Sequence, residues 1–225
     1  MANNKSITLK NITKQYGSTV TALNDVSFTI LPNEFKVIMG QSGSGKSTFL
    51  QITGLLDSAT TGKVIINGSN TESLSKNELA KIRMKTLGFV FQSFHLNPNM
   101  RAYENVMMPM FINPEFTSKS QMEKRAKELI DRVGLSERST HYPGELSGGE
   151  QQRVAIARSL ANDPDFILAD EPTGNLDSQN EKSVFDLLKQ LSTEGKGVLV
   201  VSHNDLAKEY ADTLYTMKDG VLKEG

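Results

Sequence analysis

The chain contains no cysteine, no signal-like apolar leader and no apolar run long enough to span a membrane. Without cysteine it forms neither disulfides nor thiolate metal sites, which fits a reducing compartment. Its longest apolar runs, such as residues 197–201, are far shorter than the ~20 residues that a membrane-spanning helix needs. The first residues lack the apolar segment of a signal peptide. We therefore expect a soluble, cytoplasmic chain that reaches a membrane only through a partner.

The chain also lacks an excess of charge of either sign. It has 25 lysines and arginines against 26 aspartates and glutamates. This balance argues against a nucleic-acid protein that relies on a general basic surface, so we expect no nucleic-acid partner. At 225 residues the chain is long enough for one large domain or two small ones, either with a substantial core.

Strand and helix patterns alternate along most of the sequence. The alternation implies a mainly parallel sheet that binds ligands at its carboxyl edge. Capping boxes at Ser75–Glu78 and Ser118–Gln121 are expected to open two of the helices. A helical block at about 97–164 interrupts the alternation and is interpreted as an inserted subdomain. The predicted strands cover 7–12, 26–30, 35–39, 63–67, 87–91, 166–169 and 198–201, and the main predicted helices cover 48–56, 75–85, 103–108, 122–133, 149–161 and about 184–191.

Residues 40–47 match the phosphate-binding loop, in which glycines fold the backbone around phosphates and a lysine and a serine close the motif. A strand pattern precedes this loop and a helix pattern follows it, so the helix N-terminus would offer free N–H donors to an anion. Lys46 is expected to reach the β- and γ-phosphates and the Ser47 hydroxyl to hold Mg²⁺. The plain alternative is a glycine-rich turn closed by a lysine, a pattern that chance produces in roughly one such chain in a hundred. We therefore predict nucleotide binding by Gly40, Ser42, Gly43, Ser44, Gly45, Lys46, Ser47 and Thr48.

Two acids follow the apolar strand pattern at 166–169. An acid at the end of a buried parallel strand lies beside the phosphate loop, where it can orient water on Mg²⁺, and Asp170 suits that role. Glu171 is one residue further on and could accept a proton from the attacking water or polarise it. Two acids that merely cap a strand are the alternative, which the phosphate loop upstream makes the weaker one.

Two further strands deliver polar side chains to the same edge of the sheet. His203 follows 198–201 and is expected to contact a γ-phosphate, whereas His95 and His141 lack such a context and are interpreted as structural or solvated. Gln92 follows another predicted strand, and its amide could bind Mg²⁺ or water in one conformation and release it in another. A glutamine at a strand end carries little weight by itself, so its assignment depends on further motifs.

The segment Leu146–Arg153 supplies such a motif. Together with the phosphate loop and the acid pair it resembles the ABC-type ATPase cassette, and the resemblance covers nearly the whole chain. It implies one α/β domain over 1–225: a P-loop NTPase with a mainly parallel core sheet, an N-terminal antiparallel β subdomain and an inserted α-helical subdomain. The catalytic core would comprise 1–96 and 165–225, and the helical subdomain about 97–164.

The resemblance also assigns roles to single residues. Tyr16 is similar to the aromatic residue that stacks on adenine, and residues 174–177 resemble the D-loop. Gln92 and His203 resemble the Q-loop glutamine and the switch histidine. The cofactors implied are ATP and Mg²⁺, the residues implied for the metal are Ser47, Gln92 and Asp170, and those implied for catalysis are Lys46, Gln92, Glu171 and His203.

Ser147, Gly148 and Gly149 precede a predicted helix, so they form a second anion cradle at a helix N-terminus. A serine-capped helix start would explain the serine but not the paired glycines. In the family this signature faces the phosphate loop of a second subunit, which implies a head-to-tail homodimer that forms on ATP binding. Glu150 stands where many cassettes have glutamine, and we expect it to contribute to the same nucleotide contact. Water would then attack the γ-phosphate in line, with catalysis by positioning and charge neutralisation.

A finer resemblance points to one bacterial branch. Segments 91–96, 104–106, 142–147 and 170–177 look like cassettes that serve macrolide efflux, lipoprotein release and antimicrobial-peptide resistance. That branch pairs with an integral membrane permease that has a large extracytoplasmic domain. The resemblance therefore implies a peripheral position on the inner face of the cell membrane, and export or extrusion of a drug, peptide or lipoprotein.

Two other functional classes stay open at this point. The same cassette could belong to a force-transmitting regulator of wall hydrolysis or signalling that moves no substrate. A soluble ATPase of ribosomes or DNA is the other class, but such chains usually carry two cassettes or a long coiled coil. This chain has one of each motif and no sustained heptads between residues 47 and 146, which makes that class the weaker one.

Overall fold

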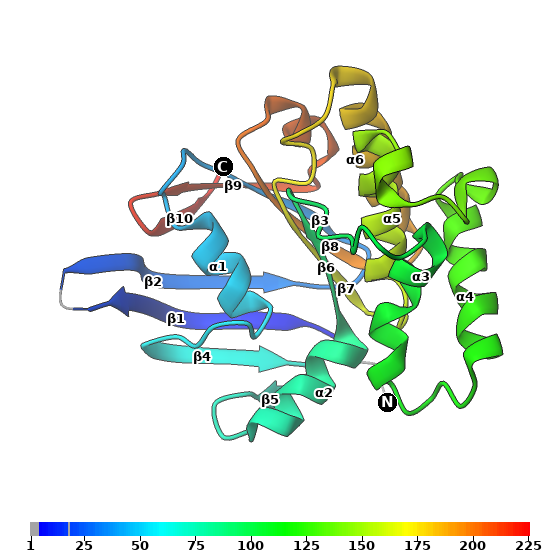
Figure 1. Cartoon of the computed structure of the whole chain (residues 1–225). Helices are drawn as coiled ribbons and strands as arrows, with labels where there is room; N and C mark the ends of the chain where they lie inside the picture. Colours follow the sequence, from blue (N-terminus) through cyan, green and yellow to red (C-terminus); the bar gives the residue numbers. More distant parts are fainter. Residues whose placement is uncertain (1–4, 18) are drawn as a thin grey trace.

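The computed structural model describes residues 5–17 and 19–225 (Figure 1). Within these residues the strands form two sheets, with the orders β2-β1-β4-β5 and β10-β9-β3-β8-β7-β6. The strands are β1 (Ile7–Tyr16), β2 (Val20–Ile30), β3 (Phe35–Met39), β4 (Thr61–Ile66), β5 (Ser69–Asn70), β6 (Leu87–Phe91), β7 (Phe166–Asp170), β8 (Gly197–Ser202), β9 (Thr213–Lys218) and β10 (Val221–Glu224). The helices are α1 (Lys46–Thr53), α2 (Lys76–Thr86), α3 (Ala102–Met107), α4 (Lys119–Arg132), α5 (Gly148–Ser159) and α6 (Ser178–Thr193), and the short 3₁₀ helices are η1 (Met108–Ile112), η2 (Ser136–Arg138), η3 (Pro143–Glu145) and η4 (Asp205–Tyr210).

The first sheet is antiparallel: β1 pairs with β2 and with β4, and β4 pairs with β5. Its strands bury alternate apolar side chains, as Ile7 and Leu9 of β1 show. Alternation of this kind covers one face of a sheet and leaves the other to solvent. Strands β1 and β2 are longer than predicted because their polar tips still pair, with Tyr16 opposite Val20.

The second sheet holds the parallel strands β3, β6, β7, β8 and β9, with β10 as an antiparallel edge. Every residue of β3 and β8 is buried, so both faces of these strands are covered. This explains the continuous apolar runs in their sequences. The turn between β9 and β10 contains Asp219 and Gly220, both with positive φ, and forms the final hairpin.

Apolar side chains pack on both faces of the parallel sheet. Neighbouring residues of β3 point to opposite sides, so Val37 contacts the layer of α5 and α6, and Ile38 contacts the layer of α1. In the second layer Phe28 of β2 and Phe49 of α1 meet edge to face with ring centroids 5.2 Å apart. Helix α1 is therefore held between the two sheets, which fixes the phosphate loop that precedes it.

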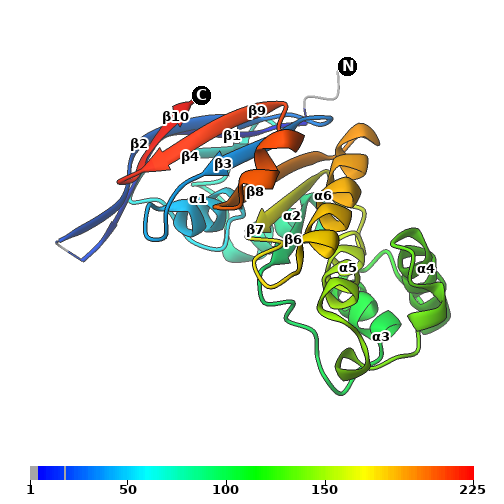
Figure 2. The same cartoon turned by 90° about the horizontal axis from the view of Figure 1, so that it is seen from above.

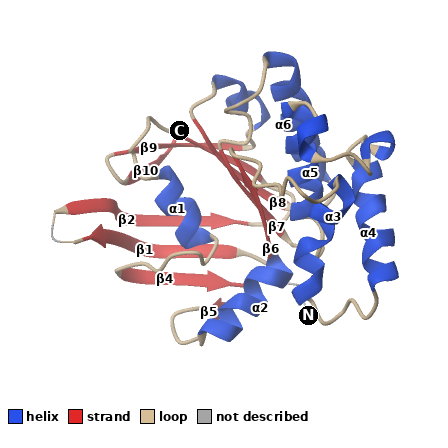
Figure 3. Cartoon of the chain, in the orientation of Figure 1, coloured by secondary structure: helices blue, strands red, loops and turns tan. Residues whose placement is uncertain are grey.

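Helices α3, α4 and α5 pack against one another, away from the antiparallel sheet (Figures 2 and 3). The apolar stripe of α4, which includes Ala126 and Leu129, is buried, and Ser75 opens α2 with the predicted capping box to Glu78. Within residues 5–17 and 19–225, no helix combines the length and the apolar composition that a membrane span requires. The antiparallel sheet, the mainly parallel core sheet and the added helices confirm the predicted fold class.

Two local predictions differ from the structure. Helix α1 ends at Thr53, earlier than predicted, because Leu55 adopts a left-handed φ of 56°. The capping box predicted for Ser118 and Gln121 forms only in part: the Ser118 hydroxyl accepts a bond from the Gln121 N–H, but the Gln121 side chain accepts one from the N–H of Thr117.

Candidate active site

A cleft of about 980 Å³ opens at the carboxyl edge of the parallel sheet, beside the N-terminus of α1. The predicted residues that line it are Ser42, Gly43, Gly45, Lys46, Ser47, Thr48, Gln92, Asp170, Glu171 and His203. Strand ends far apart in the sequence thus bring most of the predicted site together. The lining also includes Thr21, Ala22, His95, Asp219 and Gly220, for which no sequence motif provides a signal.

The N-terminus of α1 leaves its first N–H groups free for a ligand. Its N-cap is Gly45, which has no side chain to cap the helix, and the first turn of α1 contains no acidic residue. Gly45 has a φ of 108°, and a Cβ there would collide with the carbonyl oxygen of Ala22, so the position requires glycine. Free donors and the helix dipole together favour an anion at this place.

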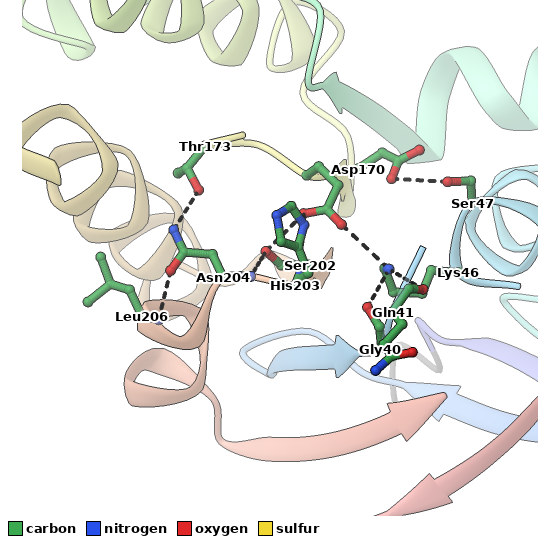
Figure 4. Close-up of polar contacts among 11 residues, drawn as sticks. Gly40, Gln41, Lys46, Ser47, Asp170, Thr173, Ser202, His203, Asn204 and Leu206 are labelled. Carbon is green, nitrogen blue, oxygen red and sulfur yellow. Dashed lines mark hydrogen bonds and ion pairs between the residues drawn. The ribbon is translucent and has the colours of Figure 1, made fainter. Parts of the chain in front are cut away.

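The Lys46 side chain folds back over its own loop (Figure 4). Its Nζ donates hydrogen bonds to the carbonyl oxygens of Gly40 at 2.6 Å and Gln41 at 3.1 Å. The same ammonium lies 3.5 Å from Oε1 of Glu171, and the two side chains are only 7% and 14% exposed. A positive charge is therefore held at the floor of the cleft, next to the free N–H groups of α1.

The carboxylate of Glu171 is held by the end of β8 as well. Its Oε2 accepts hydrogen bonds from the Ser202 hydroxyl and from the backbone N–H of His203, both at 3.1 Å. The Nδ1 atom of His203 lies 2.9 Å from the same oxygen. Glu171 also has a left-handed φ of 46°, a conformation that L-residues adopt mainly where surrounding contacts impose it. The carboxylate is thus fixed in position at the mouth of the parallel sheet.

Ser47 and Asp170 form the oxygen-rich part of the cleft. The Ser47 hydroxyl donates to Oδ1 of Asp170 over 3.4 Å. Burial raises the pKa of Asp170 and the charge of Glu171 adds to the rise, whereas the bond from Ser47 and the charge of Lys46 oppose it. Among the described residues no group of three histidine, cysteine, aspartate or glutamate side chains could hold a metal. A hydroxyl and a carboxylate nevertheless suit Mg²⁺, which prefers oxygen ligands and keeps water and phosphate oxygens around it.

Gln92 extends from the end of β6 into the same cleft and is exposed. The backbone carbonyl oxygen of Gln92 accepts a hydrogen bond from Asn175 Nδ2 at 3.1 Å. Gly174 lies so close that a Cβ there would come within 2.7 Å of Gln92 Nε2. The predicted Q-loop and D-loop therefore touch. His95, which was interpreted as structural or solvated, also lines the cleft and packs edge to face on Phe91.

Apart from the signature residues, three predicted nucleotide contacts lie outside the lining of the cleft. Gly40 and Ser44 lie within the phosphate loop, and Ser44 is 9% exposed. Tyr16 ends β1 and is 43% exposed; its hydroxyl donates to Asp57 at 2.8 Å, and Lys14 Nζ lies 4.8 Å above its ring. The ring is thus braced by two charged neighbours and keeps an exposed surface.

The second predicted cradle lies at the start of α5. Ser147 and Glu150 form a capping box: the Ser147 hydroxyl accepts from the Glu150 N–H at 3.3 Å, and the Glu150 carboxylate accepts from the Ser147 N–H at 2.8 Å. Bonding from Ser147 lowers the pKa of Glu150, and Arg138, 3.3 Å away, adds to this. None of the four residues 147–150 lines the cleft of the phosphate loop within the part of the chain that the structure describes.

The paired glycines of that cradle have different surroundings. A Cβ at Gly149 would collide with the side chain of Asn180 in α6, so packing inside the chain already requires glycine there. A Cβ at Gly148 would meet Leu176 at an ordinary contact distance of 3.4 Å. The sequence interpretation, which assigned both glycines to anion binding, missed this packing reason for Gly149.

Comparison with known proteins gives the family. The sequence model described as ABC transporter matches residues 23–174. An uncharacterized ABC transporter ATP-binding protein of Methanocaldococcus jannaschii, MJ1508, is 47% identical over 97% of this chain and 98% of its own. The lipoprotein-releasing system ATP-binding protein LolD of Francisella tularensis is 43% identical over 98% of this chain and 97% of its own. The macrolide export ATP-binding/permease protein MacB of Chlorobaculum tepidum is 46% identical over 96% of this chain, which spans 33% of that protein.

Solved structures agree with the sequence relatives. The dimeric structure of MJ0796, described as a bacterial ABC transporter cassette, has a TM-score of 0.87 and 45% identity over 97% of this chain and 98% of its own. A dimeric post-hydrolysis structure of MJ0796 with ADP and Pi has the same TM-score and 44% identity. With the phosphate loop, the acid pair and the signature all present on this fold, the chain belongs to the ABC transporter family as an ATP-binding, ATP-hydrolysing subunit.

Proposed function

We propose that this chain binds MgATP in the cleft at the N-terminus of α1, pairs head to tail with a second copy, and uses hydrolysis to drive a membrane permease. The observation that carries the proposal is the convergence of Lys46, Ser47, Asp170, Glu171 and His203 on one cleft, from strand ends far apart in the sequence. The catalytic core comprises 1–96 and 165–225, and the helical subdomain comprises about 97–164.

The phosphates bind at the free N–H groups of α1 and at Lys46. The Lys46 ammonium contacts the backbone of its own loop and the Glu171 carboxylate. When a triphosphate binds, the ammonium exchanges these contacts for contacts with phosphate oxygens. Tyr16 offers its exposed ring to adenine. The remaining contacts come from Gly40, Ser42, Gly43, Ser44, Gly45, Ser47 and Thr48.

Ser47, Asp170 and Gln92 would hold Mg²⁺ through their oxygen atoms, since all three line the cleft. When bound, the ion neutralises charge that develops on the phosphates. Glu171 polarises the attacking water, and His203, which contacts the Glu171 carboxylate, keeps it oriented and faces the γ-phosphate. Positioning and electrostatic stabilisation then account for the rate.

Head-to-tail pairing follows from the two separate cradles. The Ser147 hydroxyl accepts from a backbone N–H and therefore keeps its own hydrogen free to donate to a phosphate. Ser147, Gly148, Gly149 and Glu150 lie outside the cleft of their own chain, so they complete the cleft of a partner. Dimeric structures of the related MJ0796 cassette support the pairing of two copies.

The relatives LolD and MacB support a role in extrusion. Their names describe lipoprotein release and macrolide export. We accordingly assign to this chain a permease partner with a large extracytoplasmic domain and a peripheral position on the inner face of the membrane. Affinity purification from native membranes followed by a transport assay with the purified complex tests this. A complex that hydrolyses ATP but moves no solute would favour the regulatory alternative.

Sedimentation of the Glu171→Gln variant tests the core of the proposal. Loss of the carboxylate is expected to stop hydrolysis and leave ATP binding intact, so MgATP should convert the variant from monomer to dimer. Adding Lys46→Ala to the same variant should keep it monomeric, because the phosphates lose their charged partner. A Glu171→Gln variant that binds MgATP and remains monomeric at every concentration would contradict head-to-tail pairing.

A further inference from the structure

Gln152 is a fully buried polar residue in the interior of α5, with 0% of its surface exposed. Its Nε2 donates to the carbonyl oxygen of Pro172 at 2.6 Å and to that of Phe91 at 3.3 Å. Both partners are acceptors, so only the NH₂ end of the amide can face them. The orientation of the side chain is therefore determined by the backbone that surrounds it.

The two acceptors stand next to the proposed catalytic residues. Phe91 ends β6 and directly precedes Gln92, and Pro172 directly follows Glu171. Strands β6 and β7 are parallel neighbours that end in register, with Phe91 opposite Asp170. One side chain on α5 thus holds both of the loops that leave these strands.

The other end of the amide has no partner. Among the described residues, Oε1 of Gln152 is buried and accepts no hydrogen bond. An unpaired buried acceptor destabilises a fold, and an apolar side chain of similar length would fill the space without that cost. What glutamine contributes at this position is therefore its NH₂ group, which pairs two backbone carbonyls beside the proposed catalytic residues.

Helix α5 connects Gln152 to the signature. The helix begins at the Ser147–Glu150 capping box, and Gln152 lies little more than one turn further along. In the proposed dimer a facing nucleotide would contact this helix start, and a displacement there would reach the amide through the helix. The short bond to Pro172 and the longer bond to Phe91 then transmit it to the backbone beside Glu171 and Gln92.

We propose that Gln152 is a positioning residue for ATP hydrolysis, which links the signature helix to the loops of Gln92 and Glu171 in the same chain. Through it, contact of the signature with the partner's ATP adjusts the catalytic carboxylate of this chain's own cleft. The inference rests on the proposed function, since it requires ATP hydrolysis by a dimer. It adds a residue that touches neither nucleotide.

The test compares Gln152→Met with Gln151→Met. Methionine has a similar length but donates no hydrogen bond. Gln151 is a matched control, because within residues 5–17 and 19–225 its Nε2 donates only to Leu146 O, at 3.1 Å, just before its own helix. Gln152→Met is expected to bind ATP with a Kd within about threefold of the unaltered chain and to lose about tenfold or more in kcat. Gln151→Met is expected to keep both values.

A spectroscopic readout separates positioning from simple structural support. The chain has no tryptophan, so Phe94→Trp places a single reporter on the loop after Gln92, at a residue outside the cleft lining. A slowly hydrolysed ATP analogue with Mg²⁺ is expected to shift the tryptophan emission in the reporter protein with both native glutamines and in the reporter protein that carries Gln151→Met. In the Gln152→Met background the shift should be lost although the analogue still binds. If Gln152 had only a structural role, Gln152→Met would lower the ATP affinity and the melting temperature. Every molecule that binds the analogue would then still show the full emission shift.

A Gln152→Met variant with kcat within about twofold of the unaltered chain, or with the full emission shift, would overturn the inference. If this variant does not fold, Gln152→Asn decides by the same two measurements, because it keeps the amide but is too short to hold both carbonyls. Absence of ATPase activity in the unaltered chain would instead count against the proposed function, so the two failures are distinguishable.

Discussion

The ammonium of Lys46 and the carboxylate of Glu171 form a nearly buried ion pair, with 3.5 Å between Nζ and Oε1. The pair joins the phosphate loop to the end of β7 through the two residues that the proposed mechanism uses most. A charge left without its partner in such a place is costly, whereas loss of both charges costs much less. The stability of this protein and its catalysis therefore depend on the same two side chains.

A double-mutant cycle measures this coupling. Lys46→Met and Glu171→Gln are each expected to lower the free energy of unfolding by about 2 kcal/mol, because each leaves one unpaired charge. The double variant should be less destabilised than the sum of the two. Urea denaturation of the four proteins gives the coupling energy, and strict additivity would show that the pair contributes nothing.

His203 is expected to affect turnover and not binding. His203→Ala removes the ring that lies against the Glu171 carboxylate, and we expect kcat to fall by about 100-fold, the range of a lost acid–base or orienting group. The Kd for MgATP should change little, because the phosphate loop is untouched. Single-turnover hydrolysis and calorimetric titration separate the two effects. A large loss of affinity with unchanged single-turnover rate would remove His203 from catalysis.

Mixed dimers test the composite site. Ser147→Tyr blocks the cradle that one subunit offers, and Lys46→Ala disables the phosphate loop of the other. In a heterodimer of the two variants, one composite site combines both defects and the other combines two intact halves. We expect each variant alone to be inactive and the mixture to recover part of the ATPase activity. No recovery at any ratio would contradict the head-to-tail arrangement.

Asp170 is expected to oppose folding at neutral pH. Burial raises its pKa above the ordinary value of 3.8, which means that the folded chain holds the proton more tightly than the unfolded chain. Its contribution therefore favours folding at acid pH and is lost as the pH rises through the folded-state pKa. Asp170→Asn should raise the melting temperature at neutral pH, and the difference from the unaltered chain should shrink toward about pH 4.

The same variant should lose Mg²⁺-dependent ATPase activity, since an amide replaces the carboxylate beside Ser47. Thermal unfolding across the pH range and an ATPase assay are sufficient measurements. A difference in melting temperature that grows as the pH falls would reverse the sign of the argument and contradict the raised pKa.

Much of the fold could be predicted because its signals are local. The buried strands that end at Asp170 and Ser202 are unbroken apolar runs, and the phosphate loop carries its own spacing. Since parallel strands end at one edge, the meeting of Lys46, Glu171 and His203 in one cleft followed from topology alone. Helix starts at Ser75 and Ser147 follow from capping residues within a few positions.

The remaining features depend on contacts between distant residues, which no short pattern records. The bond between Tyr16 and Asp57 and the return of the Lys46 ammonium to Glu171 are of this kind. Gln152 is another example, because the sequence shows only two adjacent glutamines. The packing of α5 buries Gln152 against Pro172, whereas Gln151 donates to Leu146. The Gln121 side chain likewise accepts a hydrogen bond from the N–H of Thr117, because the preceding loop places that N–H within reach.

The contact between Gly149 and Asn180 determines how experiments on the signature must be interpreted. A methyl group at Gly149 would collide with the side chain of Asn180 even in an isolated monomer. Loss of activity in Gly149→Ala can therefore follow from this internal clash as well as from a failed contact between subunits. A methyl group at Gly148 meets only an ordinary neighbour and disturbs no helix. In the proposed dimer, Gly148 is therefore the position at which a single methyl group tests the contact with the partner's triphosphate without a clash inside the chain.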